Sequence, residues 1–342
     1  MLDYITEVNR KQVEIPAVEL LVDERFPWRE RKMKTLRLAR LYEIAGYKDY
    51  AVKSAGCSTW LQYGIQPDGA KKLQAVNFCQ LRLCPMCMAR RAKKAAYRLS
   101  KVLDMVETEH DARFLFLTLT IKNCTGPELG QTIEALTKGW YRFLEQRRIE
   151  RSVRGWFRAL EVTRRDKGYH PHLHVILAVE PGYFTDPNLY LPQSELVQRW
   201  RKALRVDYDP SVRISVTRAR GEKAAGRAAA VEAAKYAVKD EDYIDPKLSD
   251  EAAADILRDY TIALRGRRLT AFGGWMKEAA KALKVEELEK GDLVHIDEEA
   301  IRDDVAVLIE EYRWSFGAGD YILSARMPGE KPQSPLRVER RA

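Results

Sequence analysis

Residues 154–180, RGWFRALEVTRRDKGYHPHLHVILAVE, predict two strands joined by a turn. The first strand is expected over residues 156–163 and the second over residues 172–179, with a basic turn that ends in Gly168 between them. Side chains alternate across a strand, so His172 and His174 point to the same face. Two imidazoles spaced in this way are positioned to bind one metal ion.

The first strand carries one carboxylate, Glu161, among apolar residues. If the strands pair as an antiparallel hairpin, Glu161 comes up beside the two histidines and completes a metal site with positions open for water or a phosphate. His170 is the rival third ligand, although it lies at the mouth of the strand before Pro171. Taken alone, the two histidines would be explained equally well by hydrogen-bonded imidazoles on a surface.

Length and composition describe a globular protein of about two domains. The 342 residues are 46% hydrophobic and 32% charged. No apolar run approaches the ~20 residues that span a bilayer, and the N-terminus lacks the basic start and apolar block of a secretion signal. We therefore expect a cytoplasmic protein that has no membrane partner.

The net charge of +9 is spread unevenly along the chain. Residues 71–101 hold nine Lys or Arg and no Asp or Glu, whereas residues 285–311 hold eleven acids and two bases. A basic body of this kind favours a polyanionic partner, with nucleic acid first, over a merely solvated basic surface. The acidic block is expected to be a solvated helix, and the tail from Pro328 onward is expected to be disordered.

Four of the five cysteines predict a zinc site. Cys84 and Cys87 form a C-P-M-C pair, and the two-residue gap lets both thiolates bind one tetrahedral ion. Cys79 is close enough to supply a third thiolate, and Cys57 is the fourth and least certain ligand. Cys124 is left over as a plain thiol. Disulfides are not expected in a reducing cytoplasm, so the alternative is a set of unrelated buried cysteines.

A basic helix is expected directly after the cysteine pair, over residues 88–103. A helix of this kind, anchored by zinc, is a candidate for docking on DNA. The residues that would contact DNA there are Arg90, Arg91, Lys93 and Lys94.

The hairpin is embedded in a β-α-β-β-α-β order of predicted elements. A strand over residues 113–121 and a helix over residues 128–148 precede it, and a helix over residues 194–204 and a strand over residues 212–217 follow it. This order is the split ferredoxin-like plan. It predicts an α+β fold in which an antiparallel sheet has its helices on one face and leaves the other face free for nucleic acid. The candidate DNA contacts are Thr118, Thr120 and Asn123.

A third motif lies in the alanine-rich stretch of residues 226–239, which is expected to be helical. Glu232 and Tyr236 are four residues apart and share one helix face, with Lys235 and Lys239 beside the tyrosine. Neighbouring lysines stabilise a phenolate that can attack phosphorus, and a glutamate one turn away can orient or activate water. A tyrosine packed into the core beside surface lysines is the alternative interpretation.

The segments FLFLTLT, HPHLHV and EAAKYAVK, in this order, resemble the three motifs of the HUH endonucleases. More closely, the chain resembles the replication initiator (Rep) proteins of rolling-circle plasmids from Gram-positive bacteria. The basic segment CPMCMARRA is similar to the cysteine-containing N-terminal part of that family. The resemblance covers about residues 57–275 and includes LRGRRLTAFGGW, after the tyrosine motif.

The resemblance implies a site-specific nick at a plasmid double-strand origin, with single-stranded or hairpin DNA at the nick. Tyr236 would attack the scissile phosphate, which leaves a 5′-phosphotyrosyl link and a free 3′-OH primer. The two histidines and Glu161 would hold Mg²⁺ or Mn²⁺. Lys235 and Lys239 would stabilise the phenolate or bind adjacent phosphates. A host helicase and polymerase are further implied partners, and a homodimer is left open.

Termination of a replication circle needs a second cleavage, and the motif helix carries one tyrosine. The resemblance to the single-tyrosine branch of the family implies that Glu232 activates water for this second cut. Tyr243 is a second candidate tyrosine, close to the end of the predicted helix and before Asp245 and Pro246.

Three regions are expected along the chain. Residues 1–105 form a basic, zinc-binding region, residues 106–265 form the HUH nicking domain, and residues 266–342 form a helical extension with the acidic block and the tail. An HUH-type transposase or mobilisation relaxase would carry the same site. A non-catalytic zinc-containing protein that binds nucleic acid through the sheet is a further alternative, and it predicts no metal-dependent cleavage.

Overall fold

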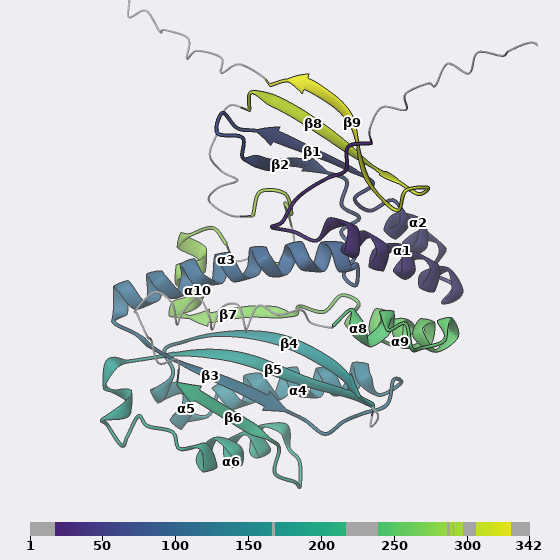
Figure 1. Ribbon diagram of the computed structural model, residues 1–342. Coiled ribbons are helices and arrows are strands. Elements are labelled where there is room, and N and C mark those ends of the chain that lie inside the picture. Colours follow the sequence, from purple (N-terminus) through teal and green to yellow (C-terminus); the bar gives the residue numbers. More distant parts are fainter. Residues whose placement is uncertain are drawn as a thin grey trace, which may run out of the picture.

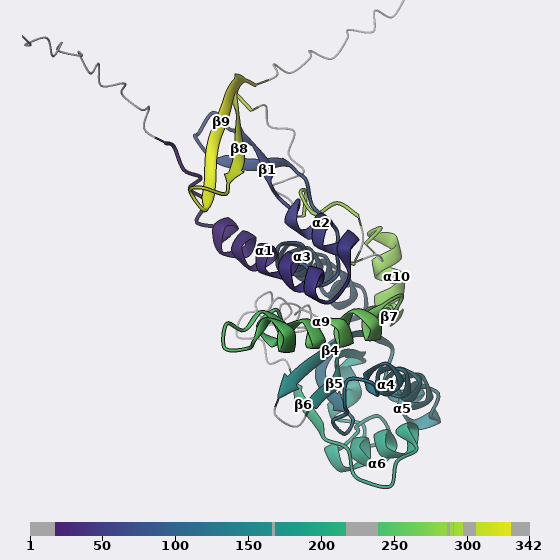
Figure 2. The same cartoon turned by 90° about the vertical axis from the view of Figure 1, so that its right-hand side faces the viewer.

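The computed structural model describes residues 18–165, 168–216, 239–285, 288–289, 291–296 and 306–329. Two antiparallel sheets lie at opposite ends of the molecule, with a layer of helices between them and further helices beyond the larger sheet (Figure 1, Figure 2). This arrangement confirms the α+β class that the sequence predicts.

The larger sheet has five strands in the order β6-β3-β5-β4-β7, and all neighbouring strands are antiparallel. The strands are β3 (Arg113–Thr120), β4 (Gly155–Arg165), β5 (Gly168–Val179), β6 (Val212–Val216) and β7 (Thr270–Gly274). The helices between β3 and β6 are α4 (Leu129–Leu144), α5 (Arg147–Ser152), the 3-10 helix η1 (Pro181–Phe184) and α6 (Gln193–Leu204). The predicted order of elements is therefore present, with the helix expected over residues 128–148 divided into α4 and α5.

One face of this sheet packs against α4, α6 and α9 (Asp250–Leu264). The alternation in RFLFLTLT turns Leu117 and Leu119 of β3 toward these helices, where they are fully buried with Trp140 of α4 and Trp200 of α6. Burying one leucine side chain contributes roughly 1.5–3 kcal/mol. The apolar face therefore determines which side of each strand faces the helices.

Helices also cover part of the opposite face, so the expectation of helices on one face only is wrong. There α3 (Pro85–His110) and α10 (Trp275–Ala282) pack on Phe157 of β4 and Ile176 of β5, with Val102 among the buried residues of α3. The reason is that α3 has an apolar face of its own, and β5 continues past the histidines with apolar residues on the histidine side.

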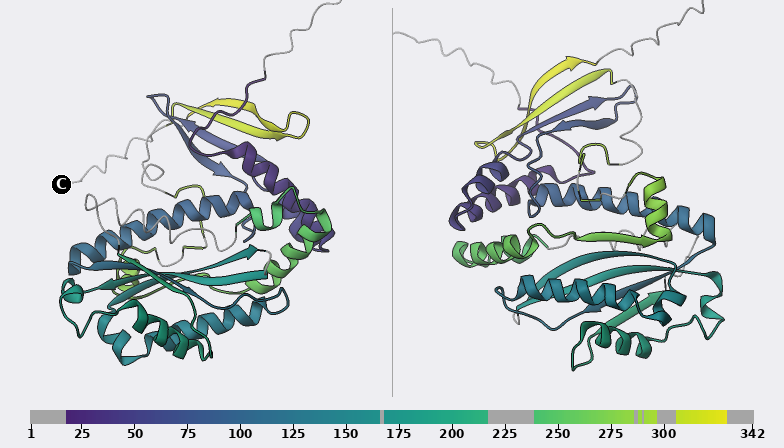
Figure 3. Two further views of the ribbon diagram at one scale, coloured as in Figure 1. Left: turned by 60° about the horizontal axis from the view of Figure 1, so that its bottom comes forward. Right: turned by 180° about the vertical axis from the view of Figure 1, so that it is seen from behind.

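The smaller sheet joins the two ends of the described chain in the strand order β2-β1-β8-β9. Its strands are β1 (Trp60–Ile65), β2 (Lys71–Val76), β8 (Leu308–Ser315) and β9 (Asp320–Pro328). Figure 3 shows the hairpin of β8 and β9, in yellow, beside the purple-blue strand β1. Tyr312, Trp314 and Tyr321 are buried, and the ring of Trp28 in α1 (Trp28–Ile44) packs edge-on against Tyr321.

The C-terminal extension is helical only at α10 within the residues that the structure describes. The end of the acidic block forms strand β8, because Tyr312 and Trp314 alternate with polar residues and supply an apolar face. The larger sheet also extends beyond residue 265, since β7 pairs with β4. The remaining helices are α2 (Lys48–Ala55) and α8 (Glu241–Ile244). Within the described parts of the chain, every helix is too short or too polar to cross a membrane.

Candidate metal centres

The hairpin of β4 and β5 brings three of the predicted ligands together. Glu161 pairs with His172 across the hairpin, and His174 lies two residues further along β5. Glu161 Oε2 lies 2.6 Å from His174 Nε2 and 3.3 Å from His172 Nε2. Because β3 borders β5 on its other side, Thr118 and Thr120 stand next to His174 and His172 on the same face. The predicted DNA contacts of β3 therefore lie beside this Glu161–His172–His174 cluster.

Hydrogen bonds hold the two imidazoles in the orientation that metal binding needs. His172 Nδ1 lies 3.0 Å from the carbonyl oxygen of His170. A carbonyl oxygen only accepts, so Nδ1 carries the proton and the lone pair of a neutral ring is on Nε2, which faces Glu161. His174 Nδ1 lies 3.4 Å from the hydroxyl of Thr118, and its Nε2 also faces Glu161. Such outer contacts fix the rings of metal-binding histidines.

Glu161 is ionised in this setting. Burial raises the pKa of the Glu161 carboxyl, but hydrogen bonds from His172 and His174 and the charges of these rings outweigh burial and bring the pKa well below its ordinary value. The three ligand atoms lie within 4.8 Å of one another. A bound ion would replace the ring protons that face Glu161. Two imidazoles and one carboxylate would then form a donor set for a divalent ion with positions left open, so the residues present fit a divalent metal ion.

The rival ligand His170 stands outside this cluster. Its Nδ1 lies 2.7 Å from Oδ1 of Asn123, and its ring stacks next to that of His172, with 5.4 Å between the centroids. Asn123, a predicted DNA contact, is therefore hydrogen-bonded to His170 at the end of β3. The geometry favours Glu161 over His170 as the third ligand.

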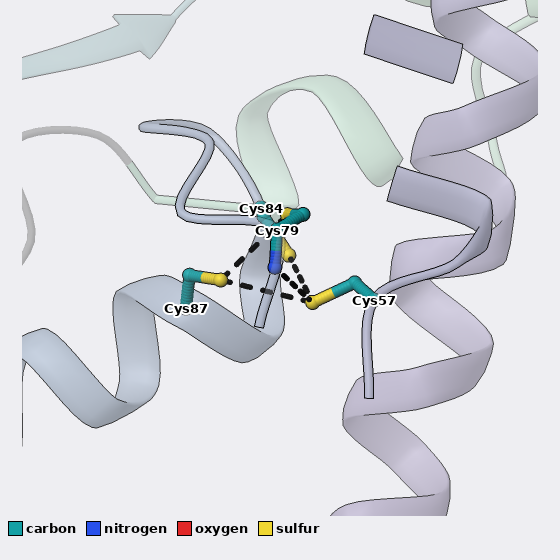
Figure 4. Close-up of side chains that lie close together, drawn as sticks. All are labelled: Cys57, Cys79, Cys84 and Cys87. Atoms are coloured by element: carbon teal, nitrogen blue, oxygen red, sulfur yellow. Dashed lines mark hydrogen bonds between the residues drawn. The ribbon is translucent and has the colours of Figure 1, made fainter. Parts of the chain in front are cut away.

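A second cluster consists of the four cysteines that the sequence assigned to zinc (Figure 4). The sulfur–sulfur distance is 3.7 Å for Cys57–Cys87, for Cys79–Cys87 and for Cys57–Cys84. A disulfide would require about 2.05 Å, whereas thiolates bound tetrahedrally to zinc at about 2.3 Å lie about 3.8 Å apart. The spacing therefore suits a structural zinc ion. Cys124 lies apart, near the backbone of Tyr169.

A buried lysine borders the cysteine cluster, and sequence analysis did not identify it. Lys32 of α1 is fully buried, and its ammonium donates to the carbonyls of Ala55 and Cys57 at 2.8 Å and 2.6 Å. Burial lowers the pKa of Lys32 to about 8, although the thiolates of the cluster oppose this shift. Its positive charge offsets part of the negative charge of four thiolates. The sequence spacing could have indicated that Lys32 is buried. Lys32 lies four residues after Trp28 and three before Thr35, and all three residues are buried on one face of α1.

Removal of one thiolate should release zinc. We expect Cys84→Ser to reduce the zinc content from one ion per chain toward zero and to lower the melting temperature strongly, since structural zinc contributes on the order of 10 kcal/mol to folding. The measurement is elemental analysis of purified protein together with thermal denaturation. Cys124→Ser is the matched control and should keep its zinc. A zinc ion retained by Cys84→Ser would contradict the assignment.

Comparison with known proteins assigns the family. The model of the family described as "Replication protein" matches residues 70–322. The chain belongs to this family. It is 36% identical to "Protein rep" of Lactiplantibacillus plantarum over 305 aligned positions, and the alignment covers 87% of this chain and 95% of the relative. It is 34% identical to "Protein rep" of Streptococcus pneumoniae, with 80% of this chain and 84% of the relative covered. The search of solved structures gave no significant match.

The basic helix of this replication protein is engaged inside the molecule. Arg90 is buried and donates from Nε and Nη2 to the carbonyls of Leu293 and Val294, each at 2.8 Å. Arg91 donates to the carbonyl of Glu289 at 3.1 Å, and Lys94 is also buried. The expectation that Arg90, Arg91 and Lys94 contact DNA disagrees with this placement, since residues 288–289 and 291–296 occupy that side of α3. Lys93 is the exposed member of the predicted set.

The same C-terminal segment joins α3 to the larger sheet. Glu289 Oε1 accepts hydrogen bonds from the backbone N–H groups of Leu269 and Thr270 at 2.8 Å and 2.9 Å, beside the start of β7. Its other oxygen lies 3.5 Å from Nη2 of Arg82, in the loop that carries the cysteines. The carboxylate of Glu289 therefore connects the cysteine loop to β7, and its backbone carbonyl adds the contact with α3.

Two substitutions separate hydrogen bonding from charge at this junction. Glu289→Ala should lower the free energy of unfolding by about 1–3 kcal/mol, because two backbone N–H groups lose their acceptor. Glu289→Gln should cost less, because its amide oxygen still accepts. The measurement is urea denaturation of both variants. An equal loss in the two variants would show that the charge beside Arg82 stabilises the junction instead.

The tyrosine motif lies largely outside the described residues. Glu232, Lys235 and Tyr236 lie outside the described residues. Lys239, the last residue of the motif, is described and is exposed. Tyr243 is fully buried, and its hydroxyl donates to the carbonyl of Leu83 at 2.5 Å. Burial raises the pKa of Tyr243 well above its ordinary value. The placement of Tyr243 in the core disagrees with a role as a second nucleophile.

The segment that follows the tyrosine motif is fixed to the tip of the hairpin. Asp242 Oδ2 accepts from the backbone N–H of Arg164 at 3.2 Å and from the hydroxyl of Tyr260 at 2.8 Å. Lys239 precedes Asp242 by three residues. The chain therefore leaves the tyrosine motif at the end of β4 nearest the Glu161–His172–His174 cluster.

Proposed function

We propose that this chain initiates rolling-circle replication of a plasmid by nicking and rejoining origin DNA. The observation that carries the proposal is the convergence of Glu161, His172 and His174 on the sheet face opposite α4 and α6. Membership of the replication protein family supplies the biological context. A transposase or relaxase would use the same chemistry, but the relatives are named as replication proteins.

The strand order supports a ferredoxin-like HUH domain. In chain order the first four strands of the larger sheet are β3, β4, β5 and β6, and in space they lie as β6-β3-β5-β4. Each of the two β-α-β units is thus split by a strand of the other unit. The two central strands, β3 and β5, carry Thr118, Thr120, His172 and His174 on one face. Single-stranded or hairpin DNA lies on that face.

Tyr236 is the nucleophile in the proposed reaction. Its hydroxyl oxygen forms a bond to the scissile phosphorus, the bond from phosphorus to the 3′ oxygen breaks, and this oxygen takes up a proton and leaves as the 3′-OH primer. The product is a 5′-phosphotyrosyl link. Lys235 and Lys239 stabilise the phenolate or bind adjacent phosphates. At termination Glu232 takes a proton from water, whose oxygen bonds to the second scissile phosphorus. The bond from this phosphorus to the 3′ oxygen breaks, and the 3′ oxygen takes up a proton and leaves as a 3′-OH.

Glu161, His172 and His174 would hold Mg²⁺ or Mn²⁺ next to the scissile phosphate. A divalent ion there polarises the phosphate and neutralises the charge that develops during in-line displacement. The buried carboxylate and the two fixed rings preorganise this site before DNA arrives. The four cysteines would hold a structural Zn²⁺. The cytoplasm is the proposed location, with host helicase and polymerase as partners after the nick.

A covalent-adduct assay tests the proposal. Supercoiled and single-stranded DNA from the region around the gene is mixed with the protein and Mn²⁺, and a DNA-linked band is sought on a denaturing gel. Wild type should give the band, and Tyr236→Phe should lose it because no phenolate remains to attack phosphorus. Tyr141→Phe, at an exposed tyrosine of α4 on the far side of the sheet, is the matched control and should react like wild type.

Two results would contradict the proposal. A band that persists in Tyr236→Phe would move the nucleophile to another residue. Absence of a band with every DNA tested, despite tight binding, would favour a non-catalytic zinc protein that binds nucleic acid.

A further inference from the structure

We propose that Arg165 and Arg213 bind the DNA phosphates on either side of the phosphate held at the Glu161–His172–His174 cluster. This inference rests on the proposed function, since it adds the strand's path to the same site. The two arginines lie on the same sheet face as the cluster and on opposite sides of it.

Arg213 lies in one cross-strand row with the cluster. It pairs with Thr118, which in turn pairs with His174. Residues directly opposite each other on neighbouring strands point to the same face, and the strands are about 4.8 Å apart. The backbone of Arg213 is therefore about 10 Å from that of His174. A long guanidinium side chain at this distance reaches a phosphate next to the one at the cluster.

The side chain of Arg213 is exposed, and it has no hydrogen-bond or ion-pair partner among the described residues. Its strand, β6, is an edge strand of the larger sheet as far as the structure describes it. A nucleic acid can thus approach over β6 without meeting another strand. Between Arg213 and the cluster lie Thr118 and Thr120, whose hydroxyls contact His174 Nδ1 and the carbonyl of Ser211 respectively.

Arg165 lies on the other side of the cluster, at the end of β4. It follows Glu161 by four residues, so alternation places both side chains on the same face. Arg165 is exposed. The distance along the strand from Glu161 to Arg165 is about 13 Å.

A neighbouring cation on this side of the sheet is already engaged. The ammonium of Lys122 lies 4.0 Å from the centroid of the Tyr208 ring, and the backbone N–H of Lys122 donates to the hydroxyl of Tyr208. Arg165 and Arg213 instead present planar guanidinium groups, which suit bidentate contact with phosphate. A single strand that runs from Arg213 over Thr118 and the cluster to Arg165 would meet positive charge on both sides of the reacting phosphate.

Salt dependence of single-strand binding tests the inference. The probe is a fluorescein-labelled oligothymidylate of about 20 nucleotides, and its dissociation constant is measured by fluorescence anisotropy at several KCl concentrations with no divalent ion added. Each phosphate contact on single-stranded DNA contributes about 0.7 to the slope of log affinity against log salt. Arg165→Ala and Arg213→Ala should each make the slope shallower by about 0.7, and the double variant by about 1.4.

Matched variants separate phosphate contact from general charge and from folding damage. The double variant Arg147→Ala/Arg151→Ala removes the same charge from exposed residues of α5, on the helix side of the sheet, and should leave the slope unchanged. Arg165→Lys/Arg213→Lys keeps the charge and should restore most of the slope. Equal slopes for wild type and the Arg165→Ala/Arg213→Ala variant would overturn the inference.

The assay distinguishes failure of this inference from failure of the proposed function. An unchanged slope together with a covalent adduct in wild type would remove the arginine contacts and leave the nicking function in place. A shallower slope without any adduct would retain the phosphate contacts and remove the nicking function.

Discussion

The pairing register of one hairpin determines the chemistry of this molecule. Glu161 faces the two histidines only because it stands opposite His172, and a slip of one residue would turn it to the other side of the sheet. Buried apolar residues on the opposite face, Leu160 and Leu173 among them, prevent such a slip. Packing of the face that α4 and α6 cover thus positions the polar groups of the opposite face.

Helix α3 connects the two halves of the structure. Cys84 is the residue directly before its first turn, Cys87 lies within that turn, and its later turns pack on the larger sheet through Leu99 and Val102. A zinc ion at the cysteines would therefore fix the N-terminal end of α3. The later turns of this helix cover part of the sheet face that carries Glu161, His172 and His174. The C-terminal segment strengthens this connection, because its carbonyl groups accept from Arg90 and Glu289 reaches the edge of β7.

Local patterns in the sequence predicted the site well. Glu161 and the two histidines lie on two strands that a short turn joins, so alternation along each strand was enough to predict that they share one face. The structure brings the three side chains together as expected. The zinc-binding pair Cys84 and Cys87 could also be predicted from sequence, because a gap of two residues keeps the two thiolates close enough to bind one ion. Glu232 and Tyr236 stay predictions from sequence, because they lie outside the described residues.

Contacts between distant parts of the chain could not be predicted in this way. Trp60 pairs with Arg313 in the smaller sheet, and no local pattern identifies one strand as the partner of the other. Arg90 and Lys94 have the composition of a DNA-binding helix, but their burial depends on a segment about 200 residues further along the chain. Acidic residues next to Tyr312 likewise hid the alternation that makes β8 a strand.

The most direct test of the central claim is anomalous diffraction from crystals of the full chain prepared with Mn²⁺. The account predicts one manganese peak on the sheet face opposite α4 and α6, bonded to a carboxylate oxygen of Glu161 and to Nε2 of His172 and His174. A peak held by His170 and Asn123 instead, or no peak on this face at saturating Mn²⁺, would contradict it.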